Sequence, residues 1–97
     1  MQTEGKVKGI YIAEKKYDLV ENYKDGFDQE VVEQKLTDYF DNYDYVFGDW
    51  AYGKVRLKGF YESSNKNASE INDIKNLEKY KQNNCAYDCK YFLLKSK

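Results

Sequence analysis

Hydrophobic and polar residues alternate most clearly over residues 54–61, and this two-residue period is typical of a β-strand with one buried face. Val55, Leu57 and Gly59 fall on one face of such a strand, and charged residues fall on the other. Gly53, just before it, allows a tight bend. The pattern therefore predicts a strand that follows a turn and is covered on one side.

Shorter patterns predict the rest of the sheet. The β-prone runs 9–12 and 17–23 are separated by four small or polar residues, which favours a hairpin. Residues 45–47 predict a third strand, and the Gly-Asp-Trp sequence at 48–50 predicts a turn after it. Residues 89–95 are apolar on both faces, so they predict a last strand that lies inside the sheet or under helices.

Two segments follow the spacing of three to four residues that marks a helix with one buried face. The first begins at Asp28, a good N-cap, where Phe27 is placed for a hydrophobic staple. Its apolar positions are Val32, Leu36, Tyr39, Phe40 and Tyr43. Ser69 or Asp73 is expected to cap the second helix, which frays around residues 82–84. Its apolar positions are Ile71, Ile74, Leu77 and Tyr80.

The element order is therefore ββαββαβ. This order indicates an α+β domain, with a mainly antiparallel sheet of about five strands and two helices packed on it. Residues 62–69 are a polar loop, and no repeat or linker divides the chain. We expect a single domain over residues 9–97. Residues 1–8 lack an apolar period, so they predict a flexible N-terminal tail.

Composition and charge narrow the possible functions. The chain has 97 residues, with 16 Lys and Arg against 17 Asp and Glu, a formal net charge of -1. This balance excludes a fold-wide electrostatic attraction to nucleic acid or anionic lipid. A mean hydropathy of -0.95 and the lack of a long apolar run exclude a membrane span, and a signal peptide is not indicated. The chain has no histidine, so we expect no His-dependent triad, no bound metal and no cofactor.

Three segments carry a family resemblance. Residues 48–60, GDWAYGKVRLKGF, look like the signature of the YutD-like family, and residues 18–27, DLVENYKDGF, resemble its N-terminal strand and turn. Residues 85–94, CAYDCKYFLL, are similar to its two-cysteine ending, although Asp88 and Lys90 stand where smaller residues are expected. The resemblance covers nearly the whole chain. It implies a compact α+β fold and a cytoplasmic protein of a low-GC Gram-positive bacterium, and it supplies no activity.

Cys85 and Cys89 are the two cysteines, and their C-x-x-x-C spacing differs from the C-x-x-C of zinc and redox motifs. Two cysteines without histidine cannot complete a tetrahedral zinc site in one chain, although a four-cysteine site shared in a dimer stays open. Because the implied compartment is reducing, we expect two reduced thiols near the start of the last strand.

The strongest candidate site is a basic and aromatic segment. Between Gly53 and Gly59 there are three cations and no carboxylate. Single-stranded RNA is bound in this way, because cations contact phosphates while aromatic rings stack on bases. The expected contact residues are Trp50, Tyr52, Lys54, Arg56, Lys58 and Phe60. The alternative is a solvated strand face, with Trp50 and Phe60 in the core.

Asp49 and Arg56 are a second candidate. Arg56 is the only arginine, and lysine cannot reproduce its planar, two-pronged guanidinium. Its place on an alternating strand predicts a side chain that reaches solvent. Asp49 is expected to cap backbone amides of its own turn, as Asp commonly does. The alternative is that Asp49 pairs with Arg56 and orients it towards a ligand.

An acidic cluster supports a hydrolase only if two carboxylates converge in one cleft with separated pKa values. The cluster is Asp38, Asp41, Asp44 and Asp49. Spacing does not show convergence, so an enzyme is the least favoured interpretation. The sequence favours a small cytoplasmic, non-enzymatic binding module, a monomer or weak dimer, whose ligand is RNA or a ribonucleoprotein. The alternative is a protein–protein adaptor with a Tyr- and Trp-rich surface.

Overall fold

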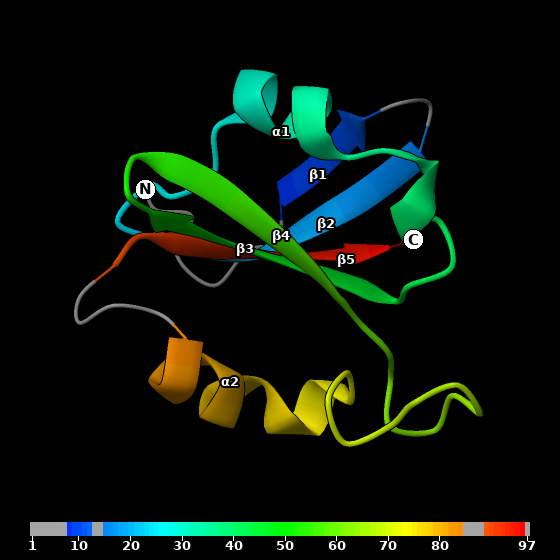
Figure 1. Ribbon diagram of the computed structural model, residues 1–97. Helices are drawn as coiled ribbons and strands as arrows, with labels where there is room; N and C mark the ends of the chain where they lie inside the picture. Colours follow the sequence, from blue (N-terminus) through cyan, green and yellow to red (C-terminus); the bar gives the residue numbers. More distant parts are fainter. Residues whose placement is uncertain (1–7, 13–14, 85–88, 97) are drawn as a thin grey trace.

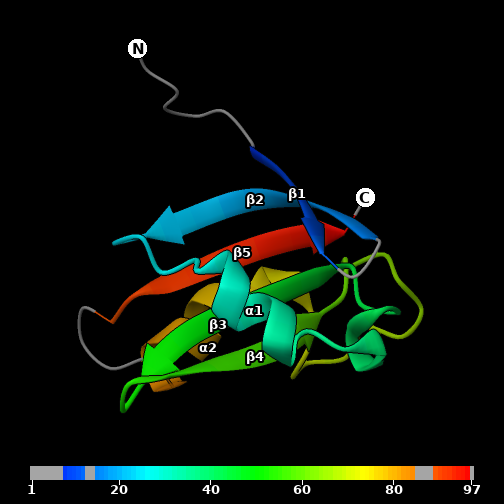
Figure 2. The same ribbon diagram turned by 90° about the horizontal axis from the view of Figure 1, so that it is seen from above.

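The computed structural model describes residues 8–12, 15–84 and 89–96. It has one five-stranded sheet, with α1 over one face and α2 over the other (Figures 1 and 2). The elements are β1 (Lys8–Ile12), β2 (Lys15–Tyr23), α1 (Gln29–Lys35), η1 (Asp38–Phe40), β3 (Tyr45–Ala51), β4 (Lys54–Phe60), η2 (Ile74–Asn76), α2 (Leu77–Asn84) and β5 (Tyr91–Ser96). Of the expected tail, Lys8 belongs to β1, and residues 1–7 lie outside the described residues.

The strand order is β1-β2-β5-β3-β4, and each neighbouring pair is antiparallel. The predicted α+β fold is therefore confirmed, including the hairpin of β1 and β2. Strand β5, the last in the chain, lies at the centre of the sheet between β2 and β3. Its residues Phe92, Leu93 and Leu94 are all buried, which confirms the predicted interior strand. Strands β1 and β4 form the two edges.

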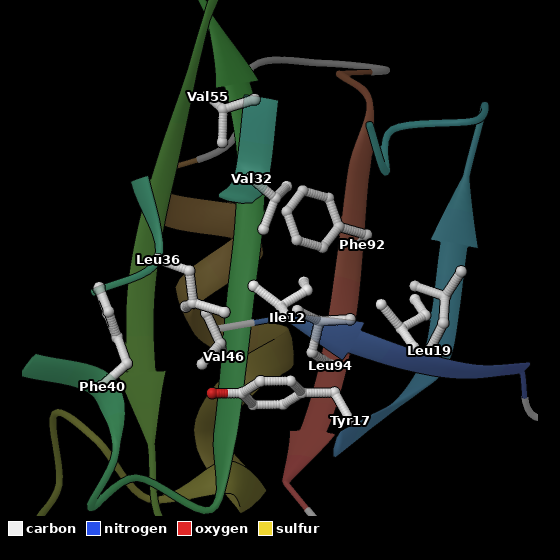
Figure 3. Close-up of a cluster of buried hydrophobic side chains, with 11 residues drawn as sticks. Ile12, Tyr17, Leu19, Val32, Leu36, Phe40, Val46, Val55, Phe92 and Leu94 are labelled. Carbon is white, nitrogen blue, oxygen red and sulfur yellow. The ribbon is translucent and has the colours of Figure 1, made fainter. Parts of the chain in front are cut away.

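Both faces of the sheet are buried. The larger hydrophobic cluster lies between the sheet and α1 and draws on all five strands (Figure 3). Its members labelled in Figure 3 are Ile12, Tyr17, Leu19, Val32, Leu36, Phe40, Val46, Val55, Phe92 and Leu94. A smaller cluster, Phe47, Phe60, Leu77 and Leu93, lies on the α2 side. Because successive side chains of a strand point to opposite faces, neighbouring residues of β3 and β4 enter different layers.

Strand β3 continues through the segment that was expected to turn. Gly48, Asp49 and Trp50 all pair with residues of β4, so the predicted turn at this point is wrong. The ring of Phe92 occupies the space where a side chain at Gly48 would lie, so this position of β3 accepts only glycine. The actual turn is Tyr52-Gly53, with φ values of 54° and 75°. Positive φ at both central residues is the type I′ geometry that suits a two-residue hairpin.

The helices are shorter than their apolar patterns predict. Asp28 caps α1 as expected, because its carboxylate accepts a hydrogen bond from the Val31 amide. Helix α1 ends at Lys35, with Leu36 as its C-cap. Thr37 then caps the separate η1 turn, because its side-chain oxygen accepts a hydrogen bond from the Tyr39 amide. Asp73 caps η2 in the same way, before α2 begins. No helix in the described part of the chain is long and apolar enough to cross a membrane.

Cys89 lies just before β5 and is disulfide-bonded, so the expected reduced thiol at this position is wrong. That expectation followed from the implied compartment, which sets the surrounding redox potential but not where the fold places a sulfur atom. Cys85, the other cysteine of the prediction, lies outside the described residues.

The raised pKa of Tyr45 leads us to expect a loss of folding stability at alkaline pH. Burial, and then a hydrogen bond from its hydroxyl to Glu62 Oε2 at 2.9 Å, raise the pKa of Tyr45 from 10.0 to about 12. A raised folded-state pKa means that this stabilisation is complete below pH 10 and is lost as pH rises through about 12. We expect the stability gap between wild type and Tyr45→Phe to narrow over that range. Denaturant unfolding at a series of pH values measures it, and parallel curves would contradict the assignment.

Candidate functional site

Strand β4 directs its charged side chains to the face of the sheet that α2 covers. Val55 and Leu57 pack in the cluster under α1, whereas Phe60 belongs to the cluster under α2. Alternation therefore places Lys54, Arg56 and Lys58 together on the α2 side. Phe60 shares this side, but its exposed fraction is 0%. It cannot stack on a base, and for this residue the alternative core interpretation is correct.

Trp50 lies on the opposite face of the sheet. Its ring packs against the α1-side cluster, and its indole N–H donates a hydrogen bond to the Gly26 carbonyl at 2.7 Å. The Lys90 ammonium lies 4.4 Å from the centre of the ring. The fold therefore separates Trp50 from the basic side chains of β4, and the predicted basic-aromatic site does not form as one surface.

Asp49 and Arg56 face each other across β3 and β4. Arg56 Nη2 lies 2.6 Å from Asp49 Oδ2, and Arg56 Nε donates to Oδ1 at 3.2 Å. The Asp49 side chain is 1% exposed, whereas that of Arg56 is 48% exposed. Asp49 therefore pairs with Arg56, which was the alternative prediction. The expected capping role for Asp49 is wrong, because β3 has no turn at this point. Arg56 reaches solvent in part, with the rest of its guanidinium held by a buried carboxylate.

Two tyrosines accompany this pair. The hydrogen bond with Asp49 raises the pKa of Arg56, burial opposes it, and the phenols of Tyr80 and Tyr52 add smaller upward shifts. Tyr52 is wholly exposed at the hairpin tip. Tyr80 was missed as a site residue, because its place in the apolar stripe of the second helix predicts only a core role. It does pack edge-on against Phe60, with 5.6 Å between ring centres, yet it also faces the charged pair.

A cavity of about 380 Å³ opens beside these residues, between β4, α2 and the loop before α2. Lys58 places its ammonium 5.2 Å from the ring centre of Phe60 and 5.6 Å from that of Tyr80. Ile71, at the same cavity, is 73% exposed. The lining also includes Asn76, Lys79 and Asn83. The cavity therefore combines apolar walls with cations.

The acidic cluster has separate structural uses. Asp41 lies 3.7 Å from the Lys15 ammonium, and Asp44 accepts hydrogen bonds from the Glu62 amide and the Asn65 side chain. Asp49 is occupied by its arginine. Within the residues that the structure describes, no group of three or more His, Cys, Asp or Glu side chains is placed to hold a metal ion.

Comparison with known proteins gives the family. Residues 11–95 match the family described as "Putative antitoxin YutD-like". Over 86 residues the chain is 41% identical to "Putative antitoxin YutD" of Bacillus subtilis strain 168, which covers 89% of this chain and 94% of that protein. The chain belongs to the YutD-like family.

The YutD-like fold has also been solved in solution. The NMR structure of protein yutD from B. subtilis superposes with a TM-score of 0.77 at 38% identity, covering 99% of this chain and 86% of that one. The resemblance inferred from the three sequence segments is therefore confirmed, together with the fold. The family description names an antitoxin and no ligand, so the ligand of this YutD-like chain has to be inferred from its own surface.

Proposed function

We propose that this YutD-like protein is a non-enzymatic binding module that docks an acidic region of a partner protein on its β4–α2 face. That face comprises Tyr52, Lys54, Arg56, Lys58, Ile71, Lys79 and Tyr80. The observation that most supports the proposal is the Asp49–Arg56 pair, in which a buried carboxylate holds a guanidinium in the middle of a row of lysines. A side chain that is ordered before binding adds less entropic cost to association.

The lysines of the β4–α2 face are available to an acidic partner. Among the residues that the structure describes, Lys54, Lys58 and Lys79 form no ion pair. Asp49 is buried and already bound to Arg56, so it does not offset their charge towards solvent. Complementary charge across an interface speeds association and discriminates between partners.

Exposed apolar and aromatic side chains favour a protein as the partner. Tyr52 and Ile71 are both well exposed, and Tyr and Arg are enriched among the residues that dominate binding energy in protein interfaces. An exposed isoleucine has no role in stacking on bases. The name antitoxin, given to the B. subtilis relative, denotes a protein that neutralises another molecule, and a binding module suits that role.

RNA is the second candidate, because three cations repeat along one face of β4. The stacking partners that the sequence predicts for it are scattered in the fold. Phe60 is buried, and Trp50 lies on the other face. Tyr52 remains as the exposed ring of the predicted set.

Charge reversal on the β4–α2 face tests the proposal. We expect the double variant Lys54→Glu/Lys79→Glu to weaken capture of the partner from lysate by about tenfold or more. The matched control is Lys16→Glu/Lys35→Glu, which changes the net charge equally at exposed lysines of β2 and α1. Capture is quantified by mass spectrometry on immobilised protein, with and without nuclease.

The two candidates give different results in this experiment. Partner protein that survives nuclease, is lost with the β4–α2 variant and is kept by the control supports the proposal. Capture that disappears with nuclease, and shows a steep dependence of affinity on salt, assigns the face to RNA. Equal capture by both double variants shows that the β4–α2 face is not the binding surface.

A further inference from the structure

We infer that the cavity between β4 and α2 receives one large apolar side chain from an acidic peptide segment, whose carboxylates lie against the lysines at its mouth. We call this cavity the α2 pocket. The inference rests on the proposed function and adds the chemistry of the partner segment. The pocket volume, about 380 Å³, lies at the lower end of the range of pockets that bind small ligands.

The walls of the α2 pocket are already in place for an apolar group. The Tyr80 ring is fixed by edge contacts to two core rings, with 5.8 Å between its centre and that of Phe47 and 5.6 Å to that of Phe60. Ile71 forms an exposed apolar part of the lining. Burying an apolar side chain between Ile71 and Tyr80 would remove the largest exposed aliphatic side chain of this face from water.

The lining of the α2 pocket carries a net positive charge, from two lysines against one carboxylate. Lys58 is held there, because its ammonium lies over both the Phe60 and Tyr80 rings. Lys79 is exposed on α2, and the carboxylate lining the pocket is that of Glu70. A peptide with acidic residues on both sides of its apolar residue matches this pattern of two lysines around an apolar centre.

A protein segment suits the pocket better than a free nucleotide. The pocket opens on the β4–α2 face, on which Arg56 lies, so a bound segment can continue from the pocket across the charged strand. A nucleotide base would use Tyr80 for stacking and would lie beside Lys58, but it would leave Lys54, which does not line the pocket, without a contact. The occupant we propose is therefore an extended acidic segment with one central apolar residue.

Four labelled peptides test this inference by fluorescence anisotropy. They combine acidic or glutamine flanks with phenylalanine or alanine at the centre. With acidic flanks, we expect phenylalanine to bind about tenfold more tightly than alanine, the scale of burying one large apolar side chain. We also expect glutamine flanks to weaken binding of both peptides. The phenylalanine preference reports the pocket, and the flank preference reports the charged face.

Two matched variants locate the effect. Ile71→Ser should abolish the preference for phenylalanine, whereas Val20→Ser, an exposed aliphatic residue on β2, should keep it. Neither residue belongs to the buried core, so both variants are expected to fold. Backbone amide NMR shifts on titration should move at Tyr80 and Ile71, and not at Gly9 on the far edge of the sheet.

Each outcome separates this inference from the proposed function. Equal binding of the phenylalanine and alanine peptides, with acidic flanks still preferred, overturns the pocket and leaves the charged face in place. A phenylalanine preference without a flank preference keeps the pocket and overturns the acidic partner. Binding of none of the peptides overturns both. Displacement of the peptides by short oligouridine, with the same sensitivity to Ile71→Ser, assigns the pocket to RNA instead.

Discussion

Arg56→Ala is expected to lower the free energy of unfolding by about 2–4 kcal/mol, because it leaves the Asp49 carboxylate buried without its cation. The lower end of this range applies if water enters the space that the half-exposed guanidinium vacates. Denaturant unfolding followed by circular dichroism measures the change. Lys54→Ala, two residues away on the same strand face, is the matched control. A loss in Arg56→Ala no larger than in Lys54→Ala would show that the pair contributes little.

A double-mutant cycle isolates the interaction. Asp49→Asn removes the buried charge, so Asp49→Asn/Arg56→Ala should be more stable than the sum of the two single losses implies. Arg56→Lys should fall between wild type and Arg56→Ala, because an ammonium keeps the charge but cannot make two parallel bonds to the carboxylate. A solvent-facing arginine, as the strand pattern predicts, would tolerate this change. The paired arginine of the structure does not.

Gly48→Ala is expected to destabilise the fold by about 2–3 kcal/mol, at the upper end of the cost of overpacking. Gly48 lies opposite Phe92 in the sheet, and an added methyl group would overlap the Phe92 ring. That ring is fully buried among residues from several elements (Figure 3), so it has little room to move. The loss of stability is measured by thermal and denaturant unfolding.

A second substitution distinguishes overlap from a backbone effect. Gly48→Ala/Phe92→Leu should recover part of the stability, measured relative to Phe92→Leu alone, because the smaller side chain makes room for the methyl group. Gly9→Ala is the control, since nothing lies within 4 Å of a side-chain carbon at that position. It should leave stability unchanged or raise it slightly, by about 0.5 kcal/mol. If Gly48→Ala behaves like Gly9→Ala, the close contact with Phe92 is not a constraint.

Local patterns in the sequence were enough to predict five strands and two helices, although not the continuation of β3 through residues 48–50. The alternation around Val55 and Leu57 places β4 correctly, and the Asp28 cap marks the start of α1. The strand and the helix cap both depend on residues that are close neighbours in the chain, so the sequence alone is enough to predict them. The apolar run ending at Leu94 likewise indicates a strand that is covered on both faces. Family membership could also be inferred, because segments such as residues 48–60 carry uncommon residues in a matching order.

Only the tertiary structure decided which side chains meet. Residues 48–50, expected to turn, are strand because they pair with β4 and with the distant strand β5. Gly48 is accommodated there because the Phe92 ring fills the space of its missing side chain. Asp49 binds Arg56 because the register of β3 on β4 sets them opposite each other, and Trp50, one residue on, consequently points to the other layer. Tyr80 lies near Asp49 and Arg56 only because α2 covers that face of the sheet. The β3–β4 register follows from the two-residue Tyr52-Gly53 turn, which the sequence pattern put at the wrong place. The positions of β5 and α2 arise from packing between residues far apart in the chain, which periodicity within a single segment does not specify.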